Sequence, residues 1–251
     1  MIDLHAVWDW FRVLHETTGI KLTIFYDAFD RARFFNGFLT SLRLMAVCLA
    51  CSVVIGVVGA WIQGSRLRLP RALTQGYIQF FRNTPPLVQL YFFYFAIGGM
   101  LPRVTDAHGA AVPPIGSFAW AAITLSLFAG AINVEIFRAG LEAVPRTMVE
   151  AAKALGLSRF GVFRHIVLPL ALRISLPSLT NNLVNLVKTT TLAYAIGVPE
   201  LLYASAQIWS EEFNVRETMT IMLIAYIGLV GLVVWGMGRW ERAWRIPGFA
   251  P

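Results

Sequence analysis

The chain has 251 residues, of which 57% are hydrophobic and only 14% are charged. A soluble domain carries about 25% charged residues, so this composition indicates an integral membrane protein and excludes an ordinary soluble enzyme. The formal net charge of +7 is typical of basic cytoplasmic loops, because the basic residues fall between apolar stretches and lack nucleic-acid-binding signatures. We therefore expect a lipid bilayer, and no nucleic acid, among the partners.

Residues 1–35 precede the first long apolar stretch and are aromatic with mixed charge. Trp8, Trp10, Phe11 and Leu14 fall on one side of a possible helix. Two interpretations stay open for this segment. It forms a periplasmic helix that lies in the outer membrane interface, or it is a leader that packs on the transmembrane bundle.

Five later stretches are long and apolar enough to cross the hydrocarbon, which requires roughly twenty residues. They cover residues 37–62, 77–101, 117–137, 174–198 and 218–238. The sequence therefore predicts an all-α integral membrane protein with five transmembrane helices.

The distribution of basic residues predicts the orientation of these helices. The first and third connections and the C-terminal tail are basic, and the basic residues of the first connection and the tail are Arg66, Arg68, Arg71, Arg239, Arg242 and Arg245. The second connection has a single arginine, and the fourth is acidic. Because short basic loops stay in the cytoplasm, we expect the N-terminus outside and the C-terminus in the cytoplasm.

The second predicted span contains Pro85 and Pro86, which cannot donate backbone hydrogen bonds and therefore interrupt a helix. We expect a bend there. Thr84 and Gln89 are weak candidates for a substrate pocket, and Arg82 is expected to extend its charge toward the cytoplasm. Glu135 and Arg138, three residues apart at the end of the third span, are expected to pair.

The largest predicted cytoplasmic element is the loop at residues 139–173. Pro145 favours the start of a first helix, and Gly156 favours its end in a left-handed cap. Ser158 can cap a second helix, which Pro169 is expected to end. The apolar residues of that second helix are expected to face the bundle, and they are Phe160, Val162, Phe163, Ile166 and Val167. A small-residue knob at the elbow could dock on a partner, and an ordinary amphipathic loop is the alternative.

The same loop carries a resemblance to a known family. Glu150-Ala151-Ala152 is followed after three residues by Gly156 and, after nine more, by Ile166-Val167-Leu168-Pro169. This pattern resembles the signature of the membrane subunits of ABC importers. Further segments resemble polar amino-acid permeases of the histidine, glutamine and glutamate type, namely Gly37, Thr40-Ser41-Leu42, residues 80–90, Glu135 to Gly140 and Asn185 to Leu192. Thr147, Met148 and Thr189 depart from the family pattern.

The resemblance covers residues 36–245 and implies the transmembrane domain of a type I ABC importer. It implies a second permease subunit, homologous or identical, a dimer of ATPase subunits, and a periplasmic or lipid-anchored amino-acid-binding protein. The ATPase would bind the elbow at Glu150, Ala151, Ala152, Leu155, Gly156 and Leu157. Because the chain lacks a phosphate-binding Gly-x-x-x-x-Gly-Lys-[Ser/Thr] loop, ATP and magnesium are expected in the partner and no cofactor is expected in this chain.

The fourth predicted span is unusually polar and holds the main candidates for substrate binding, which are Asn181, Asn182, Asn185, Lys188, Thr189 and Thr190. A lysine at the centre of a membrane costs about 2.5–3.5 kcal/mol on insertion scales, so Lys188 should face the bundle interior. We expect Lys188 to attract the α-carboxylate of an amino acid. Its pairing with Glu135, or the capping of backbone carbonyls, is the alternative. Since the stripe lacks an acid, neutral or acidic amino acids are favoured over cationic ones.

Two other classes of protein fit the sequence less well. An ion-coupled secondary amino-acid carrier requires acidic side chains within its spans, and Glu135 is the only acid in the five predicted spans. A membrane-embedded enzyme requires clustered histidines and acids at one depth, and the sequence indicates no catalytic residue and no metal site.

Overall fold

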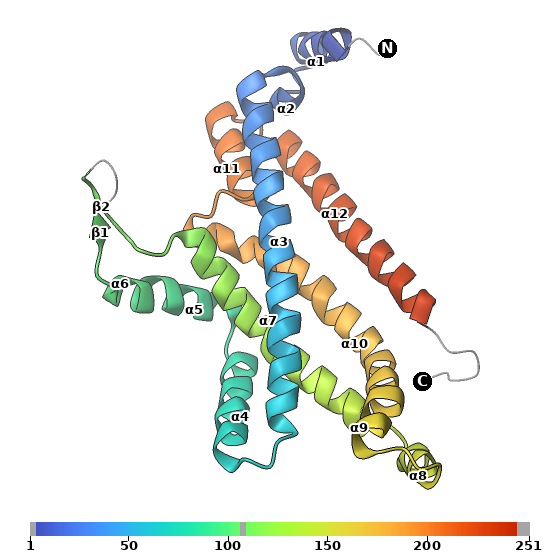
Figure 1. The fold of residues 1–251 in the computed structure, drawn as a ribbon. Coiled ribbons are helices and arrows are strands. Elements are labelled where there is room, and N and C mark those ends of the chain that lie inside the picture. The colour runs from blue at the N-terminus through green and yellow to red at the C-terminus, as the bar shows by residue number, and fades with distance from the viewer. Residues whose placement is uncertain (1–3, 106–108, 245–251) are drawn as a thin grey trace.

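The computed structural model describes residues 4–105 and 109–244, and this part of the chain is almost entirely helical (Figure 1). The first half contains α1 (Leu4–Thr18), α2 (Thr23–Tyr26), α3 (Ala28–Gln63), α4 (Arg68–Asn83), α5 (Pro86–Tyr91), the π-helical η1 (Phe92–Ile97) and α6 (Gly98–Met100). The strands β1 (Val104–Thr105) and β2 (Ala111–Val112) form a small antiparallel hairpin in which Val104 lies opposite Val112. Arg245, expected in the basic tail, lies outside the described residues.

The second half begins with α7 (Ser117–Glu142) and the short α8 (Arg146–Ala154). It continues with α9 (Arg159–Val162), the π-helical η2 (Phe163–Val167), α10 (Leu168–Thr189), the 3₁₀-helical η3 (Thr190–Ile196), α11 (Leu201–Glu212) and α12 (Val215–Trp244). The long helices α3, α7, α10 and α12 dominate the molecule, and α8 lies at the opposite end from α1 (Figure 1).

Four helical segments of the described chain are long and apolar enough to cross a bilayer: Ala28–Gln63, Ser117–Glu142, Arg159–Ile196 and Val215–Ala243. The second predicted span is not a single helix. Thr84 and Pro85 adopt extended backbone between α4 and α5, and the apolar stretch Pro86–Met100 is shorter than the other four. The bend expected at the two prolines is therefore confirmed, and α5 and α6 turn away from the direction of α4 (Figure 1). The prediction of five continuous spans is not confirmed by these helix lengths.

The first long helix begins nine residues earlier than the predicted span, at Ala28 rather than residue 37. The Asp27 side chain caps it by accepting hydrogen bonds from the backbone amides of Phe29 and Asp30, both at 2.9 Å. Aspartate is a preferred N-cap because its carboxylate satisfies amides that lack helical partners. The aromatic residues 28–35 therefore form the first turns of α3 rather than a separate leader.

Helices α3 and α7 pack against each other through small residues. A Cβ atom built on Gly56 would lie 2.5 Å from the Cβ atom of Asn133, so only glycine allows this approach. The buried core next to this contact includes Leu44, Cys48 and Leu125. Membrane helices usually associate by close approach through small residues. Lipid tails are as apolar as the helices, so the hydrophobic driving force for pairing is small.

The helix after Ser158 does not end at Pro169, so that prediction is wrong. Helical structure continues from Arg159 to Ile196. The π-helical η2 ends at Val167, two residues before the proline, and locally widens the helix. This wider turn accommodates the proline ring, which would otherwise clash with the carbonyl four residues earlier in an ordinary α-helix.

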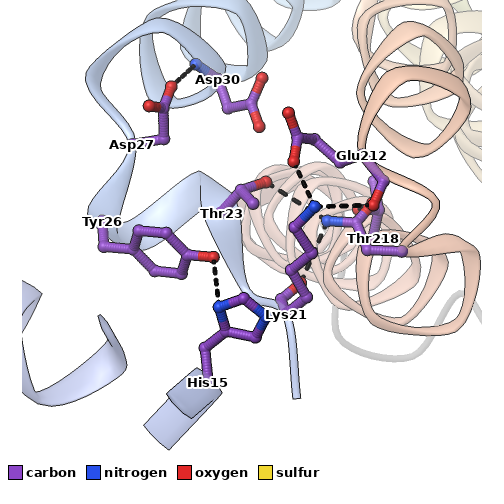
Figure 2. Close-up of polar contacts among 9 residues, drawn as sticks. His15, Lys21, Thr23, Tyr26, Asp27, Asp30, Glu212 and Thr218 are labelled. Atoms are coloured by element: carbon purple, nitrogen blue, oxygen red, sulfur yellow. Dashed lines mark hydrogen bonds and ion pairs between the residues drawn. The ribbon is translucent and has the colours of Figure 1, made fainter. Parts of the chain in front are cut away.

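The N-terminal segment is attached to the junction between α11 and α12 by a polar cluster (Figure 2). The Lys21 Nζ atom lies 2.6 Å from a carboxylate oxygen of Glu212, and the Asn214 side-chain amide donates to the Lys21 carbonyl at 3.0 Å. His15 Nδ1 and the Tyr26 hydroxyl lie 3.4 Å apart, which joins α1 to α2. The contacts of Lys21 with Glu212 and Asn214 connect segments that are nearly two hundred residues apart in the sequence.

Candidate functional site

The elbow that follows α8 is held by a glycine cap. Gly156 has φ +84°, a left-handed conformation that glycine adopts without steric cost. Its amide donates to the Lys153 carbonyl at 2.9 Å, and the Leu157 amide donates to the Ala152 carbonyl at 3.2 Å. This pair of bonds is a Schellman motif. The predicted helix end at Gly156 is confirmed, and the elbow has a defined backbone shape.

The second helix of the elbow starts as predicted, but its aromatic residues point outward. The Ser158 hydroxyl accepts a hydrogen bond from the Gly161 amide at 3.1 Å, which confirms the cap. Val162 is buried, whereas Phe160 and Phe163 are exposed, so the expectation that both rings face the bundle is wrong. Ile166 and Val167 are half-buried, so the predicted inward side of this helix is confirmed only in part.

The predicted coupling residues lie together on α8 and the elbow, and most of them are accessible. Ala152 is buried at 5% exposure, whereas Leu155 is exposed at 81%. Glu150, Ala151 and Gly156 are also exposed, and Leu157 is half-buried. Ala152 thus anchors the helix against the body of the protein. Leu155 is an exposed apolar side chain at the end of this helix, and Phe160, in the helix that follows the elbow, is also exposed.

The polar residues of α10 divide between two environments. Asn182 is buried, and its side-chain amide donates to Asn133 Oδ1 at 2.8 Å and to the Ala129 carbonyl at 3.1 Å. Thr190 is also buried and donates to the Val187 carbonyl at 2.7 Å. These groups are used in holding α10 and α7 together and in shaping the end of α10. They are not available to a ligand in this conformation.

The remaining polar residues of α10 form an exposed stripe. Asn181, Asn185 and Lys188 follow each other at steps of four and three residues, so they share one helical side, and all three are exposed. No hydrogen bond or ion pair engages their side chains within the described ranges 4–105 and 109–244. Thr189 lies at the edge of the stripe, and its hydroxyl donates to the Asn185 carbonyl at 2.8 Å. We call Asn181, Asn185 and Lys188 the polar stripe.

Glu135 does not pair with either of the residues expected for it. It accepts a hydrogen bond from the Arg82 guanidinium at 2.7 Å, and Arg138 instead lies 3.4 Å from Glu142. The prediction of a Glu135–Arg138 pair is therefore wrong, because α4 packs against α7 and places Arg82 beside Glu135. Lys188 is also not the partner of Glu135, so the structural alternative for this lysine finds no support in the described contacts.

Thr84 and Gln89 bond to each other rather than to the polar stripe. The buried Gln89 amide nitrogen donates to the Phe81 carbonyl at 2.9 Å and to the Thr84 hydroxyl at 2.6 Å. The Thr84 hydroxyl donates to the Phe80 carbonyl at 2.7 Å. The bond from Gln89 satisfies the Phe81 carbonyl, whose helical partner would be the amide that Pro85 lacks. The two residues stabilise the break between α4 and α5, and only Gln89 Oε1 stays unpaired.

The structure reveals a buried acid, Glu200, that the sequence interpretation missed. Its carboxylate caps α11 by accepting from the amides of Leu202 and Tyr203, both at 2.9 Å. It also accepts from the Tyr226 hydroxyl at 2.8 Å and from the Ser41 hydroxyl at 3.3 Å. Burial raises the pKa of this carboxyl. The available signal was its place directly after Gly197-Val198-Pro199, although glutamate is not a preferred N-cap residue.

The Glu200 network depends on a close approach between α3 and α11. A Cβ atom on Gly37 would lie 2.7 Å from the Ala204 Cβ atom and 3.1 Å from the Glu200 carbonyl oxygen. Ser41, one helical turn later, both donates to Glu200 and accepts from the Leu201 amide at 3.0 Å. In the part of the chain that the structure describes, no group of three or more His, Cys, Asp or Glu side chains could hold a metal ion.

Comparisons with known proteins agree with this architecture. Residues 52–245 match the family described as "Binding-protein-dependent transport system inner membrane component". The chain is 29% identical to a probable amino-acid ABC transporter permease, PatM of Vibrio harveyi, over 82% of this chain and 90% of that protein. It is 32% identical to the nopaline transport system permease NocM of Agrobacterium fabrum, over 84% and 90% of the two chains.

Two further similarities involve a well-characterised bacterium and a solved structure. The chain is 33% identical to the histidine/lysine/arginine/ornithine permease HisQ of Escherichia coli K12, over 68% of this chain and 75% of HisQ. The crystal structure of an amino acid ABC transporter with histidines superposes with a TM-score of 0.73 at 25% identity, covering 85% of this chain and 94% of that one. The chain therefore belongs to the family of binding-protein-dependent transport system inner membrane components, and its similarity within that family is to amino-acid ABC permeases.

Proposed function

We propose that this chain is the permease subunit of an ATP-driven importer that carries polar amino acids across the inner membrane of a bacterium. The single observation that carries this proposal is the elbow after α8. It combines a rigid glycine-capped backbone with an accessible apolar surface at Leu155, and the chain matches the family over residues 52–245. A separate ATPase dimer would bind ATP and magnesium and move this elbow.

The proposed topology keeps the N-terminus outside and the C-terminus in the cytoplasm. Four segments have the length to cross the bilayer, and α4 with the stretch Pro86–Met100 would supply the remaining crossing as a broken helix. Broken helices are tolerated inside membranes where other protein groups satisfy the freed backbone, and Gln89 does so here. The α3–α4 connection and α8 then lie at the cytoplasmic end, and both carry exposed arginines.

The proposed route for the amino acid passes along the polar stripe. Asn181, Asn185 and Lys188 are exposed in the single chain, on a helix that would otherwise face lipid. Exposing a lysine and two amides to hydrocarbon is costly, so a second permease subunit, homologous or identical, is expected to cover this side and enclose a polar pathway. A periplasmic or lipid-anchored binding protein would deliver the substrate to its outer end.

The charge of the polar stripe supports neutral or acidic amino acids over cationic ones. Lys188 supplies a positive charge for a carboxylate, and the other members of the stripe are neutral amides. A cationic side chain would require an acidic partner at the same depth. Glu200 cannot serve this purpose from its buried position, since its oxygens already accept four hydrogen bonds. The relatives include permeases named for basic amino acids and permeases named for acidic ones, so they do not distinguish these substrates. The proposed preference for neutral or acidic amino acids therefore rests on the charge of the polar stripe.

The test is uptake by the complete complex in proteoliposomes, with and without ATP and the ATPase subunit. Labelled glutamine, glutamate and arginine should rank in favour of the first two, and uptake should require ATP. Uptake by the permease alone under an ion gradient would instead support the secondary carrier. Arginine as the best substrate would contradict the charge argument and leave the ATP-driven mechanism intact.

A variant of the elbow tests the coupling separately. Gly156→Leu forces a bulky residue into a left-handed conformation and obstructs the docking surface, so uptake and stimulated ATP hydrolysis should both fall at least tenfold. Gly109→Leu is the matched control, since Gly109 has φ +80° and open space around it but lies in the hairpin between β1 and β2. Equal activity of the two variants would count against the elbow as the site of coupling.

A further inference from the structure

A small basic cleft lies where α3 ends and α4 begins. It has a volume of about 260 Å³ and is lined by Gln63, Arg68, Arg71, Ala72 and Gln75. Arg68, Arg71 and Gln75 are spaced by three and four residues, so α4 presents them on one side. This connection lies at the same end of the molecule as α8 (Figure 1). The cleft is remote from the polar stripe and from the elbow in sequence, and neither proposed role uses it.

The cleft is positively charged and lacks a counter-charge. The sequence from residue 43 to residue 105 contains no aspartate or glutamate, and Arg66 adds a third arginine beside the two that line the cleft. All three arginines are exposed, and none is paired with an acid in the described residues. The Gln63 amide donates to Gln75 Oε1 at 3.2 Å. The Gln75 amide nitrogen is thereby left as a further donor in the cleft.

The start of α4 adds to the attraction for an anion. Its N-cap, Leu67, offers no side chain to the first amides of the helix, and the first turn contains no acid. Unpaired amides and the helix dipole favour a negative group at this end. Arginine recognises phosphate oxygens through parallel hydrogen bonds from its planar guanidinium. Two arginines, a glutamine amide and a helix start thus form a set of donors suited to a phosphate group.

An apolar stripe on α4 runs beside these donors. Leu69, Leu73 and Phe80 share one helical side at steps of four and seven residues, and they are 70%, 66% and 44% exposed. A third side of the same helix, with Ile78 and Phe81, is buried against the protein. An exposed apolar stripe next to a row of arginines is typical of a helix at a membrane surface, where acyl chains cover the apolar side and headgroups meet the charges.

The size of the cleft limits the ligand that it can take. Pockets for whole small molecules usually measure about 300–1,000 Å³, so a cleft of about 260 Å³ suits one headgroup. Basic pockets between membrane helices on the cytoplasmic side are known to bind anionic lipid headgroups. A phosphate diester in the cleft, with its acyl chains along Leu69 and Leu73, uses the donors and the apolar stripe together. A free phosphate ion would use only the donors.

We propose that the cleft formed by Gln63, Arg68, Arg71 and Gln75 binds the phosphate headgroup of an anionic membrane lipid. The interaction fastens the start of α4 to the inner leaflet. This proposal concerns a different site from the transport pathway, and its outcome is independent of the substrate and of the ATPase coupling.

Lipid binding to the purified complex tests the proposal. Native mass spectrometry would measure retention of phosphatidylglycerol and of phosphatidylcholine with the same acyl chains, after delipidation and titration. An arginine in contact with the headgroup should contribute about fivefold to the binding of an anionic lipid, so Arg68→Gln and Arg71→Gln should each weaken phosphatidylglycerol binding by that factor and the double variant by about thirtyfold. Phosphatidylcholine binding should not change.

Three controls complete the design. Arg242→Gln removes an exposed arginine near the end of α12 that does not line the cleft, and it should bind phosphatidylglycerol like the wild type. Leu73→Gln should weaken lipid binding without affecting inorganic phosphate. The helical circular dichroism of each variant should match the wild type. If instead the double variant retained phosphatidylglycerol as well as Arg242→Gln does, the proposal would be overturned. If inorganic phosphate bound as tightly as the lipid and Leu73→Gln had no effect, the lipid assignment would fall.

Discussion

Two polar regions of this apolar protein differ in how their side chains are satisfied. Glu200 is 1% exposed and accepts four hydrogen bonds from α3, α11 and α12. The polar stripe of α10 is exposed, and within the described residues its side chains have no hydrogen-bonding partner. Both regions place a charged side chain in a protein with few charged residues. Of the two, only the Glu200 carboxylate has hydrogen-bond partners within the described residues.

We propose that this difference separates polar groups with a structural role from polar groups with a role in transport. A buried group with every bond satisfied stabilises a particular arrangement of helices, and its loss leaves other groups unpaired. The polar stripe has no partner within the described residues and lies on a helix of membrane length, so we expect a ligand or another subunit to contact it. We therefore expect substitutions in the Glu200 network to change stability and substitutions in the polar stripe to change transport.

The largest stability effect is expected for Glu200→Ala. This change leaves the amides of Leu202 and Tyr203 and the hydroxyls of Ser41 and Tyr226 without their acceptor. An unsatisfied buried group costs about 1–3 kcal/mol, so the variant should lose about 3 kcal/mol or more of unfolding free energy. Thermal unfolding in detergent, followed by tryptophan fluorescence, measures the loss. Glu211→Ala is the control, since Glu211 is half-exposed and its ion-pair partner within residues 4–105 and 109–244 is Arg33 alone. Equal losses in both variants would contradict a special role for Glu200.

The pH dependence of stability should also report on Glu200. Burial raises its pKa above the ordinary value of 4.5, so the folded state holds the proton more tightly than the unfolded chain does. The stabilisation is present in full below pH 4.5 and is lost as pH rises toward the folded pKa, by at most about 1.4 kcal/mol per pH unit. Glu200→Gln cannot titrate and should lack this component of the slope. Identical profiles for wild type and variant would show that the carboxyl does not carry the effect.

A smaller effect is expected for Asn182→Leu. The variant removes two hydrogen bonds to α7 while keeping a similar volume, and it leaves Asn133 Oδ1 without a donor. A loss of about 1–3 kcal/mol in unfolding free energy is expected. The neighbouring Asn181→Leu changes an exposed residue of the polar stripe and should stay within about 0.5 kcal/mol of the wild type. Denaturant unfolding measures the unfolding free energy of both variants. A loss for Asn182→Leu but not for Asn181→Leu would show that buried and exposed polar residues differ in their effect on stability even between neighbouring positions of α10.

The smallest effect is expected at the N-terminal attachment. Lys21 and Glu212 are each about one-third exposed, so solvent screening limits their interaction to about 0.2–1 kcal/mol. Lys21→Ala should lower the melting temperature slightly and raise the susceptibility of α1 to limited proteolysis. Arg12→Ala removes a pair that is more exposed, with Asp9, and should change neither quantity. A large decrease in the melting temperature of Lys21→Ala would contradict this expectation and show that the N-terminal attachment is as important for stability as the Glu200 network.

The sequence predicts features that depend on a few neighbouring residues. The glycine cap at Gly156, the cap at Ser158 and the bend at Pro85 follow from local backbone chemistry, and the structure contains all three. Periodicity also identifies Asn181, Asn185 and Lys188 as one side of a helix. Hydropathy locates four long helices but not their ends, because a cap such as Asp27 can extend a helix through an aromatic, less apolar segment.

Features that depend on distant residues were not predictable in the same way. Glu200 is acidic and follows a proline, so it resembles an exposed loop residue until Ser41 and Tyr226 are placed beside it. Arg82 meets Glu135 because α4 packs against α7, two helices whose paired residues lie more than fifty positions apart in the sequence. Pro169 usually indicates a helix end, and the π-helical turn that accommodates it has no simple sequence signal. Contacts between helices decide each of these cases.

The most direct test of the account is amino-acid uptake by a reconstituted complex that carries Lys188→Met. Methionine keeps much of the side-chain length but removes the charge that we assign to the substrate carboxylate. Losing a charge-assisted hydrogen bond of about 1.5–3 kcal/mol should lower uptake roughly tenfold to a hundredfold at limiting substrate, with the melting temperature unchanged. Normal uptake with normal stability would contradict the role of the polar stripe. Loss of stability equal to that of Glu200→Ala would show that Lys188 is a structural ion.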